Sequence, residues 1–312
     1  MERDPFHAHV DPEVAAFNSE LERLLATYPR VDTLEPTVAR AEREAGRSIF
    51  GAFVFSDQAE ERIVSLRTGE RRIRVFRAEE PRAVYLHIHG GGWTLGGVHH
   101  QDPRLSELSR ACSATVVSID YRLAPENPYP AAPDDCEAAA LWLVEHASEF
   151  GSDRMLIGGE SAGAHLTVVT LLRLRDRHRL TPFAAANLIY GAFDLRGTPS
   201  VRNWGDRLLV LNTPIIEWFT DNFVPKDRRD DPDVSPLLAD LTGLPPALFT
   251  VGTEDPLLDD SLFMYERWRA AGNAAELALY PGAAHAFDGF PLAIGEEARR
   301  RTYEFMGAII AT

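Results

Sequence analysis

The residues best suited to covalent chemistry lie in one short segment, Gly159-Glu160-Ser161-Ala162-Gly163. The apolar run before this segment predicts a short buried strand, and the run after it predicts a helix. A serine between strand and helix, with a glycine two residues to either side, has the pattern of a nucleophile elbow. The sharp turn forces a positive φ on Ser161, and side chains at the two glycines would collide with neighbouring backbone. The segment therefore predicts a nucleophilic serine, with a chance glycine–serine turn as the alternative.

A serine nucleophile needs a base, and three histidines follow it in the chain: His165, His178 and His285. His165 is four residues along the predicted nucleophile helix, so its ring points along that helix rather than back at Ser161. His178 ends the same helix among charged residues. Only His285 follows a predicted strand at its carboxyl end, where the active sites of α/β proteins lie. We therefore expect His285 to be the base.

The third member of such a site is a carboxylate after the preceding strand. Four acids compete for this place: Glu254, Asp255, Asp259 and Asp260. Asp255 comes directly after the turn and before a proline that fixes the backbone, whereas Glu254 would point to the opposite side. Asp259 and Asp260 suit the first turn of the next helix, near the positive end of its dipole. We expect Asp255 to hold the imidazole of His285 in the right tautomer and to stabilise the imidazolium.

A glycine-rich loop offers donors for the oxyanion of a tetrahedral intermediate. The predicted strand 83–88 runs directly into His89-Gly90-Gly91-Gly92-Trp93. Glycines let bare amides approach a ligand oxygen that any side chain would obstruct. We expect the amides of Gly91, Gly92 and Ala162 to bind the oxyanion and His89 to brace the loop. The alternative is a flexible glycine turn.

The dipeptide His99-His100 raises the possibility of a metal site. His87 and His89 are expected on other faces or as braces, and no acid-rich cluster joins the pair in the sequence. We therefore expect no metal ion, and catalysis by the serine, histidine and carboxylate described above needs no cofactor.

The elements that position these residues follow from the apolar pattern. Near-continuous apolar runs predict strands that are buried on both faces, as in parallel sheets with crossover helices. An alternating pattern at 61–66 and 71–76 predicts a hairpin with one exposed face before them. The predicted buried strands are 83–88, 114–119, 154–157, 185–190, 246–251 and 276–280, and the helices between them are about 103–112, 134–150, 161–178, 258–272 and 295–311. The sequence therefore predicts one doubly wound α/β domain over residues 1–312.

Two segments do not fit this alternation. Residues 11–28 and 35–45 have the pattern of amphipathic helices, and residues 195–240 form an insertion that is too long for a plain loop. We expect about 1–50 and 195–240 to form a cap over the end of the sheet, the alternative being two outer structural layers. The apolar residues expected to line the pocket are Trp93, Trp204, Leu208, Leu209, Trp218 and Phe287. Such a lining favours short-to-medium acyl or aromatic esters over charged ones.

Composition excludes some classes of function. The chain has 312 residues, and its 47 acidic against 32 basic residues give a net charge of −15. This balance argues against a nucleic-acid binder and against an anionic membrane as partner. Cys112 and Cys136 lie in predicted helices, as buried thiols in a reducing compartment do. With no signal-peptide pattern at the start and no apolar run near the ~18 residues of a membrane span, we expect a cytoplasmic protein.

Five motifs occur in an order that is far more specific than any one of them. They are His89-Gly90-Gly91-Gly92-Trp93, Asp120-Tyr121-Arg122-Leu123-Ala124-Pro125-Glu126, Gly159-Glu160-Ser161-Ala162-Gly163, Asp255-Pro256-Leu257 and His285-Ala286-Phe287. Together they resemble the hormone-sensitive-lipase-like branch of the α/β-hydrolases, which includes many microbial carboxylesterases. The resemblance implies a mostly parallel eight-stranded sheet with a helical cap. It also implies Ser161, Asp255 and His285 as a triad. The chain departs from the common family pattern at Glu160, where Asp is usual, and at Asn127, where His is frequent.

These patterns predict a serine carboxylesterase that acts on a small-molecule ester through an acyl-enzyme. An amidase, lactonase or transacylase would use the same triad and remains an alternative. A non-catalytic small-molecule receptor is a weaker alternative, because a receptor of this family usually lacks a triad member. Members of the family are often dimers, so a homodimer also remains open.

Overall fold

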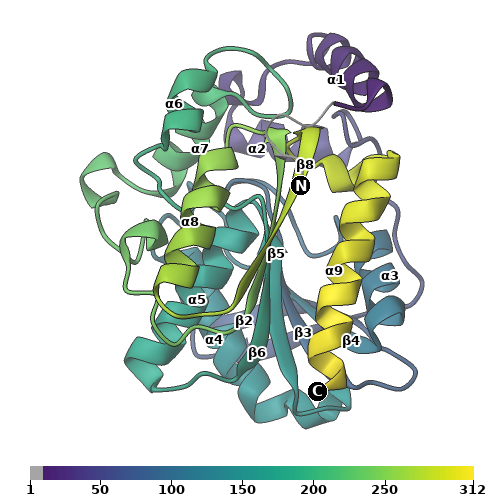
Figure 1. The fold of residues 1–312 in the computed structure, drawn as a ribbon, viewed down its shortest axis with the longest axis vertical. Helices are drawn as coiled ribbons and strands as arrows, with labels where there is room; N and C mark the ends of the chain where they lie inside the picture. The colour runs from purple at the N-terminus through teal and green to yellow at the C-terminus, as the bar shows by residue number, and fades with distance from the viewer. Residues whose placement is uncertain (1–9) are drawn as a thin grey trace, which may run out of the picture.

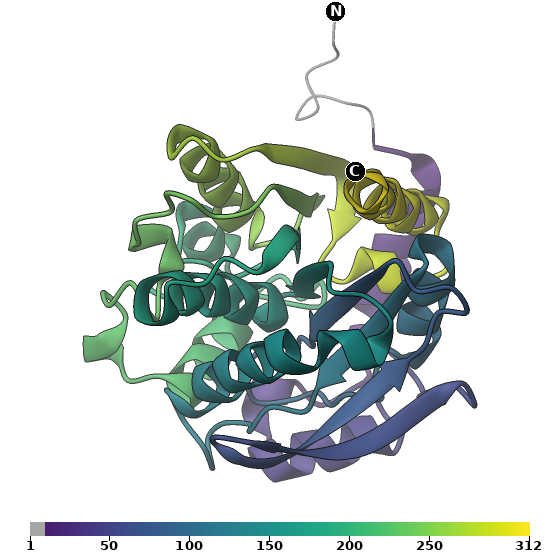
Figure 2. The same cartoon turned by 90° about the horizontal axis from the view of Figure 1, so that it is seen from below.

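The computed structural model describes residues 10–312, and its centre is one sheet of eight strands. The strand order is β1-β2-β4-β3-β5-β6-β7-β8, with the β1–β2 hairpin at one edge and β8 at the other (Figure 2). β1 and β2 pair antiparallel, β2 pairs antiparallel with β4, and every later pair is parallel. The strands are β1 (Ala59–Leu66), β2 (Gly69–Phe76), β3 (Ala83–Ile88), β4 (Ala114–Ile119), β5 (Met155–Glu160), β6 (Phe183–Ile189), β7 (Ala247–Glu254) and β8 (Ala275–Ala284).

Five helices cover the two faces of the sheet. Figure 1 shows α3 (Asp102–Cys112) and α9 (Ala293–Ala311) on one side, with α4 (Ala131–His146), α5 (Ala162–His178) and α8 (Leu258–Ala270) on the other. Every residue of β3 and β4 is buried, as expected of strands packed between two helical layers. The predicted doubly wound α/β fold is confirmed.

Four further helices lie at the carboxyl end of the strands, the end where the strands stop in the upper part of Figure 1. They are α1 (Pro12–Leu25), α2 (Pro36–Glu44), α6 (Pro199–Trp204) and α7 (Thr213–Phe223). Short 3-10 turns elsewhere in the chain are Val31–Thr33, Ala147–Phe150, Lys226–Arg228, Pro236–Leu238 and Phe287–Gly289. Caps fix where two of the four helices begin. The Asp11 side chain accepts from the Glu13 amide at 2.8 Å, and Asn212 accepts from the Ile215 amide at 3.0 Å.

The expected cap segments meet at this end of the molecule. Leu21 of α1 belongs to a buried cluster with Leu209 of the insertion and with Phe290, which follows β8. Arg40 of α2 donates hydrogen bonds to the carbonyl oxygens of Thr94 and Ala124 at 2.7 and 2.6 Å. Residues 1–9 of the expected cap lie outside the described residues. No helix within 10–312 combines the length and the apolar character needed to cross a membrane.

Several strands differ from their predicted ranges, and β8 extends furthest beyond its own. β8 continues to Ala284, so residues that we expected in a loop before His285 belong to the strand. The reason is its pairing with β7, which continues past a register shift to join Glu254 to Ala284. Gly282 has a φ of +77° at this irregular pairing, a conformation that few residues other than glycine adopt. The strand therefore delivers His285 directly at its end.

Candidate active site

Ser161 lies in a strained turn between β5 and α5. Its φ and ψ are 55° and −120°, outside the regions that residues with side chains normally occupy. A Cβ on Gly159 would lie 2.1 Å from the Ile88 carbonyl oxygen, and one on Gly163 would lie 2.0 Å from the same atom. Both glycines are required because the backbone at the end of β3 packs directly against the turn. The sharp turn thus holds Oγ at the carboxyl edge of the sheet.

The structure brings Ser161, His285 and Asp255 together in one chain of hydrogen bonds. His285 Nε2 lies 3.1 Å from Ser161 Oγ, and His285 Nδ1 lies 2.8 Å from Asp255 Oδ2. The other carboxylate oxygen, Asp255 Oδ1, accepts from the Leu257 amide at 2.8 Å, which fixes its orientation. Because Asp255 accepts at Nδ1, that nitrogen carries the proton and Nε2 is left to accept from the serine hydroxyl. This is the arrangement of a nucleophile, a base and an orienting acid.

The other three acids after β7 serve different contacts. Glu254 forms an ion pair with Arg207, and Asp259 accepts from the Ser200 amide at 2.8 Å. Asp260 accepts from the amides of Phe193 and Asp194 and from the Thr198 hydroxyl, at 2.6, 2.9 and 2.6 Å. Asp259 and Asp260 therefore hold the insertion and the residues just before it against α8, whereas Glu254 joins the insertion to the end of β7. None of the three contacts His285. Asp259 and Asp260 lie in the first turn of that helix, as expected.

The remaining histidines after Ser161 are also occupied elsewhere. His165 Nδ1 accepts from the Trp93 indole at 3.1 Å, while Nε2 donates to the Val234 carbonyl oxygen at 2.8 Å. Burial lowers the pKa of His165 to about 4, so the ring stays neutral. His178 Nε2 lies 2.7 Å from Glu137. Neither ring reaches Ser161.

The glycine loop presents amides beside Ser161. Gly91 and Gly92 have φ values of +116° and +59°, and their amides have no hydrogen-bond partner within residues 10–312. A Cβ on Gly91 would lie 2.3 Å from the Leu95 carbonyl oxygen, and one on Gly92 would lie 2.2 Å from the Phe219 ring. The first α5 amide, that of Ala162, has no partner in this part of the chain either. Within residues 10–312 these three amides are therefore available to donate to a ligand, as the amides of an oxyanion hole must be.

Glu160 ties the nucleophile turn to the glycine loop, a contact that the sequence did not reveal. Its Oε1 accepts from the Gly90 amide at 2.8 Å, and its Oε2 lies 2.9 Å from His87 Nε2. His87 Nδ1 in turn lies 2.9 Å from the Ser118 hydroxyl. Burial alone would raise the pKa of Glu160, but His87, Arg104 and the Gly90 amide hold that pKa at about 2. The carboxylate is therefore ionised and fixes the spacing between the two halves of the site.

His89 makes the contacts expected of a brace. Its Nδ1 donates to the Gly90 carbonyl oxygen at 2.8 Å, and its ring stacks on Tyr121 with centroids 4.2 Å apart. The Tyr121 hydroxyl donates to the His89 carbonyl oxygen at 2.9 Å. Burial lowers the pKa of His89, so the ring is neutral. Tyr121 belongs to the Asp120–Glu126 motif, which thus supports the glycine loop from behind.

A cavity of about 630 Å³ opens above these residues, with Ser161 and His285 in its wall. Two groups of apolar side chains contribute to the remaining lining. We call the first the N-terminal wall: Leu25, Tyr28, Leu34, Ile49, Phe50 and Phe53. We call the second the insertion wall: Leu208, Val210, Leu211, Ile215 and Phe219.

Of the six residues expected to line the pocket, the structure places only Leu208 in the wall. Trp93 is buried and stacks on Phe223, with centroids 4.7 Å apart. Phe287 is buried against Tyr280 at 5.1 Å.

The other three expected residues, Trp204, Leu209 and Trp218, also lie outside the cavity wall. Leu209 is fully buried in the cluster that joins α1 to β8, and the indole of Trp204 donates to the Arg207 carbonyl oxygen at 2.8 Å. Trp218 packs on Phe219, and of these two rings only Phe219 lines the cavity. The sequence placed the first 50 residues in the cap but named none of the residues of the N-terminal wall as lining the pocket. All of them except Leu25 lie outside α1 and α2, so the amphipathic pattern of these helices did not mark them.

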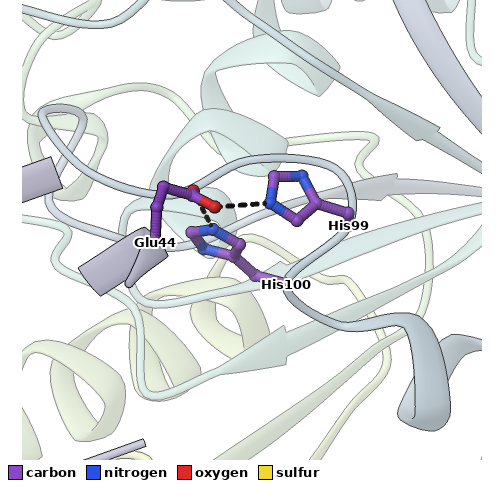
Figure 3. A group of neighbouring side chains, drawn as sticks. All are labelled: Glu44, His99 and His100. Atoms are coloured by element: carbon purple, nitrogen blue, oxygen red, sulfur yellow. Dashed lines mark hydrogen bonds and ion pairs between the residues drawn. The ribbon is translucent and has the colours of Figure 1, made fainter. Parts of the chain in front are cut away.

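An acid does join the histidine pair, contrary to expectation. Figure 3 shows Glu44 of α2 between His99 and His100, with Oε2 3.0 Å from His99 Nε2 and Oε1 2.6 Å from His100 Nε2. One ligand atom from each residue lies within 4.8 Å of the others, so the three could hold a metal ion such as Zn²⁺. The hydrogen bonds already satisfy these atoms without an ion. Burial lowers the pKa of His100 to about 3, so that ring is neutral.

Comparisons with known proteins find hydrolases that are similar to this chain. A family described as having the alpha/beta hydrolase fold matches residues 85–289. The carboxylic ester hydrolase LipN of Mycobacterium tuberculosis is 40% identical over 232 residues, which are 70% of this chain and 61% of LipN. An ethyl acetate hydrolase of Pseudomonas putida is 34% identical over 211 residues, 66% of each chain. A hyperthermophilic esterase from the archaeon Pyrobaculum calidifontis superposes with a TM-score of 0.88 at 29% identity, covering 98% of this chain and 100% of that one.

Proposed function

This chain belongs to the α/β-hydrolase family, in its hormone-sensitive-lipase-like branch, and we propose that it is a serine carboxylesterase. The observation that carries the proposal is the chain of contacts from Ser161 Oγ to His285 at 3.1 Å and from His285 to Asp255 at 2.8 Å. This chain lies in the wall of a largely apolar cavity. The names of the related esterases support the same class of reaction.

The reaction proceeds in two steps. Ser161 Oγ attacks the ester carbonyl carbon while His285 Nε2 takes the hydroxyl proton, and Asp255 stabilises the imidazolium. The amides of Gly91, Gly92 and Ala162 bind the oxyanion, and the alcohol leaves with the proton from His285. Water then attacks the acyl-enzyme, with His285 again acting as the base, and releases the acid.

The cap sets the substrate class. We assign it to the described part of the first 50 residues together with 195–240, because both segments contribute apolar side chains to the cavity. Burying an acyl chain there contributes about 0.8 kcal/mol per methylene group. With about 630 Å³ available, the cavity suits short-to-medium acyl or aromatic esters.

Hydrolysis of p-nitrophenyl esters from acetate to palmitate, with Ser161→Ala alongside, tests this function. The parent should hydrolyse the short and medium esters fastest, and Ser161→Ala should retain less than about a thousandth of its kcat. A well-folded parent that cleaves none of the esters would overturn the proposal. Parallel assays with anilides and lactones would then decide between an amidase, a lactonase and a receptor.

A further inference from the structure

The charged side chains around the cavity are paired, with one exception. Five contacts account for the others in its wall: Arg30 with Asp32, Arg47 with Glu42, Arg104 with Asp288, Arg299 with Glu107, and His87 with Glu160. The exception is Arg43, near the end of α2. Its side chain forms no hydrogen bond and no ion pair with any residue from 10 to 312.

Arg43 is partly buried, and its Nε is enclosed by the protein without a hydrogen-bond partner in the described part of the chain. The guanidinium carbon lies 4.9 Å from the centre of the Phe50 ring. Burial lowers the pKa of Arg43, opposed by the negative charges of Glu44 and Glu160 nearby. A guanidinium has five N–H donors, and an enclosed donor such as this Nε is unfavourable without a hydrogen-bond partner.

The two carboxylates nearest to Arg43 are both engaged. Glu44 precedes the turn after α2 and is held by His99 and His100, as Figure 3 shows. Glu160 is held by His87 and by the Gly90 amide. Neither lies within 4.0 Å of the guanidinium of Arg43 as an ion pair. The donors of Arg43 are therefore available to whatever enters the cavity.

We propose that Arg43 forms a carboxylate-binding subsite of this cavity, so that the preferred substrates are esters that also carry a carboxylate. The inference rests on the proposed function, because the cavity that Arg43 lines is the one that contains Ser161. A planar guanidinium can bind a carboxylate through two parallel hydrogen bonds. The apolar walls then take the hydrocarbon part of the substrate, and Arg43 takes its charged end. This departs from the expectation that an apolar lining disfavours charged esters.

Two pairs of matched esters test the subsite and show which end of the substrate it binds. Mono-p-nitrophenyl adipate carries its carboxylate on the acyl part and is compared with the corresponding adipamide, which is neutral and of the same shape. The second pair, 4-butyryloxybenzoate and 4-butyryloxybenzamide, carries the difference on the leaving alcohol. In at least one pair, the parent should show a kcat/KM about 10- to 100-fold higher for the charged ester.

Arg43→Met is the diagnostic variant, because methionine keeps the apolar contact with Phe50 and removes the charge. It should abolish the preference for the charged ester and change kcat/KM for the neutral esters by less than about 3-fold. Arg47→Met is the matched control, since Arg47 is also in the cavity wall but is paired with Glu42. The control should keep the preference of the parent.

The possible failures are distinguishable. A parent that cleaves neither the charged nor the neutral esters overturns the proposed function itself. A parent that cleaves the neutral esters but shows no charge preference, or one that Arg43→Met leaves intact, overturns the subsite alone. A measurement on the parent covers the case in which Arg43→Met does not fold. Hexanoate should inhibit hydrolysis of a neutral ester more strongly than hexanamide does, and equal inhibition by the two would contradict the subsite.

Discussion

The carboxyl edge of the sheet and the walls of the cavity are built on different principles. At the sheet edge the backbone sets the geometry: one carbonyl oxygen, that of Ile88, excludes a side chain at both Gly159 and Gly163. The walls consist of side chains from segments before and between the strands, and several belong to half-exposed residues. Chemistry is thus fixed by close backbone packing, whereas the fit to a substrate depends on side chains that can change independently.

The electrostatics of the two regions differ in the same way. Asp255 and His285 at the sheet edge are 1% and 5% exposed, so their contacts form with little competition from water. On the cap side, Glu126 pairs with Arg40 of α2 while its side chain is 47% exposed. A charge pair of the same kind contributes much less to stability when it is exposed to solvent. Changes at the sheet edge should therefore have larger effects than chemically similar changes at the cap.

Asp255→Asn should have the largest effect. An asparagine amide can donate to His285 Nδ1, which forces the wrong tautomer on the ring and removes the base from Ser161. We expect kcat to fall by about 10³- to 10⁴-fold with little change in KM. The matched control is Glu254→Gln. Glu254 pairs with Arg207 and not with His285, so kcat of this variant should stay within about 3-fold of the parent. A large loss of kcat in the control together with a small loss in Asp255→Asn would show that Asp255 is not the acid that orients His285.

Gly163→Ala tests the steric limit at the nucleophile turn. Its Cβ would lie 2.0 Å from the Ile88 oxygen, so α5 must shift away from β3. We expect the free energy of unfolding to fall by about 2–3 kcal/mol and kcat/KM to fall by about 100-fold. Gly307→Ala is the control, because that α9 position has open space around it. It should be slightly more stable than the parent, by about 0.5–1 kcal/mol. Full stability and activity in Gly163→Ala would show that the turn can relax.

Glu160→Gln should alter stability in acid. The pKa of Glu160 is depressed from its ordinary value of 4.5 to about 2 in the folded protein. The stability that this ionised carboxylate contributes is therefore present above pH 4.5 and is lost as the pH falls from 4.5 towards 2. The loss amounts to about 3 kcal/mol in the parent and should be missing in the variant. Urea unfolding at a series of pH values measures it.

The carboxylate of Glu126, which pairs with Arg40 of the cap, gives the contrast. Arg40 lowers the pKa of Glu126 as well, but that side chain is half exposed. Glu126→Gln should therefore leave the acid dependence of the parent almost unchanged. Parallel curves for the parent and Glu160→Gln would mean that the ion pair with His87 contributes nothing.

Variants at the neighbouring positions Leu208 and Leu209 should affect different properties, the first substrate preference and the second stability. Leu208→Ala enlarges the cavity, so the ratio of kcat/KM for hexanoate over acetate esters should rise by about 3- to 10-fold at nearly constant stability. Leu209→Ala should cost about 2–5 kcal/mol of unfolding free energy, because Leu209 is fully buried, and should leave that ratio unchanged. The reverse pattern would mean that Leu209, not Leu208, faces the substrate.

The sequence was most informative where local pattern and backbone geometry coincide. Buried apolar runs predicted the strands, and the order of motifs after each strand placed Ser161, Asp255 and His285. It was least informative where an apolar side chain could pack either into the interior or against the cavity. Trp93 and Phe287 have the composition of pocket residues, yet each packs into the interior against other rings. The contact of Glu44 with His99 joins residues 55 apart in the chain, and no periodicity marks such a contact.

Labelling with diethyl p-nitrophenyl phosphate tests directly whether Ser161 is the nucleophile. Ser161 Oγ should form a bond to phosphorus as p-nitrophenolate leaves, with His285 taking the hydroxyl proton. We expect one label per chain, on the peptide that contains Ser161, in parallel with complete loss of esterase activity. Ser161→Ala should take up no label. Esterase activity that survives full labelling, or a label on a different residue that abolishes it, would contradict the assignment of Ser161 as the nucleophile.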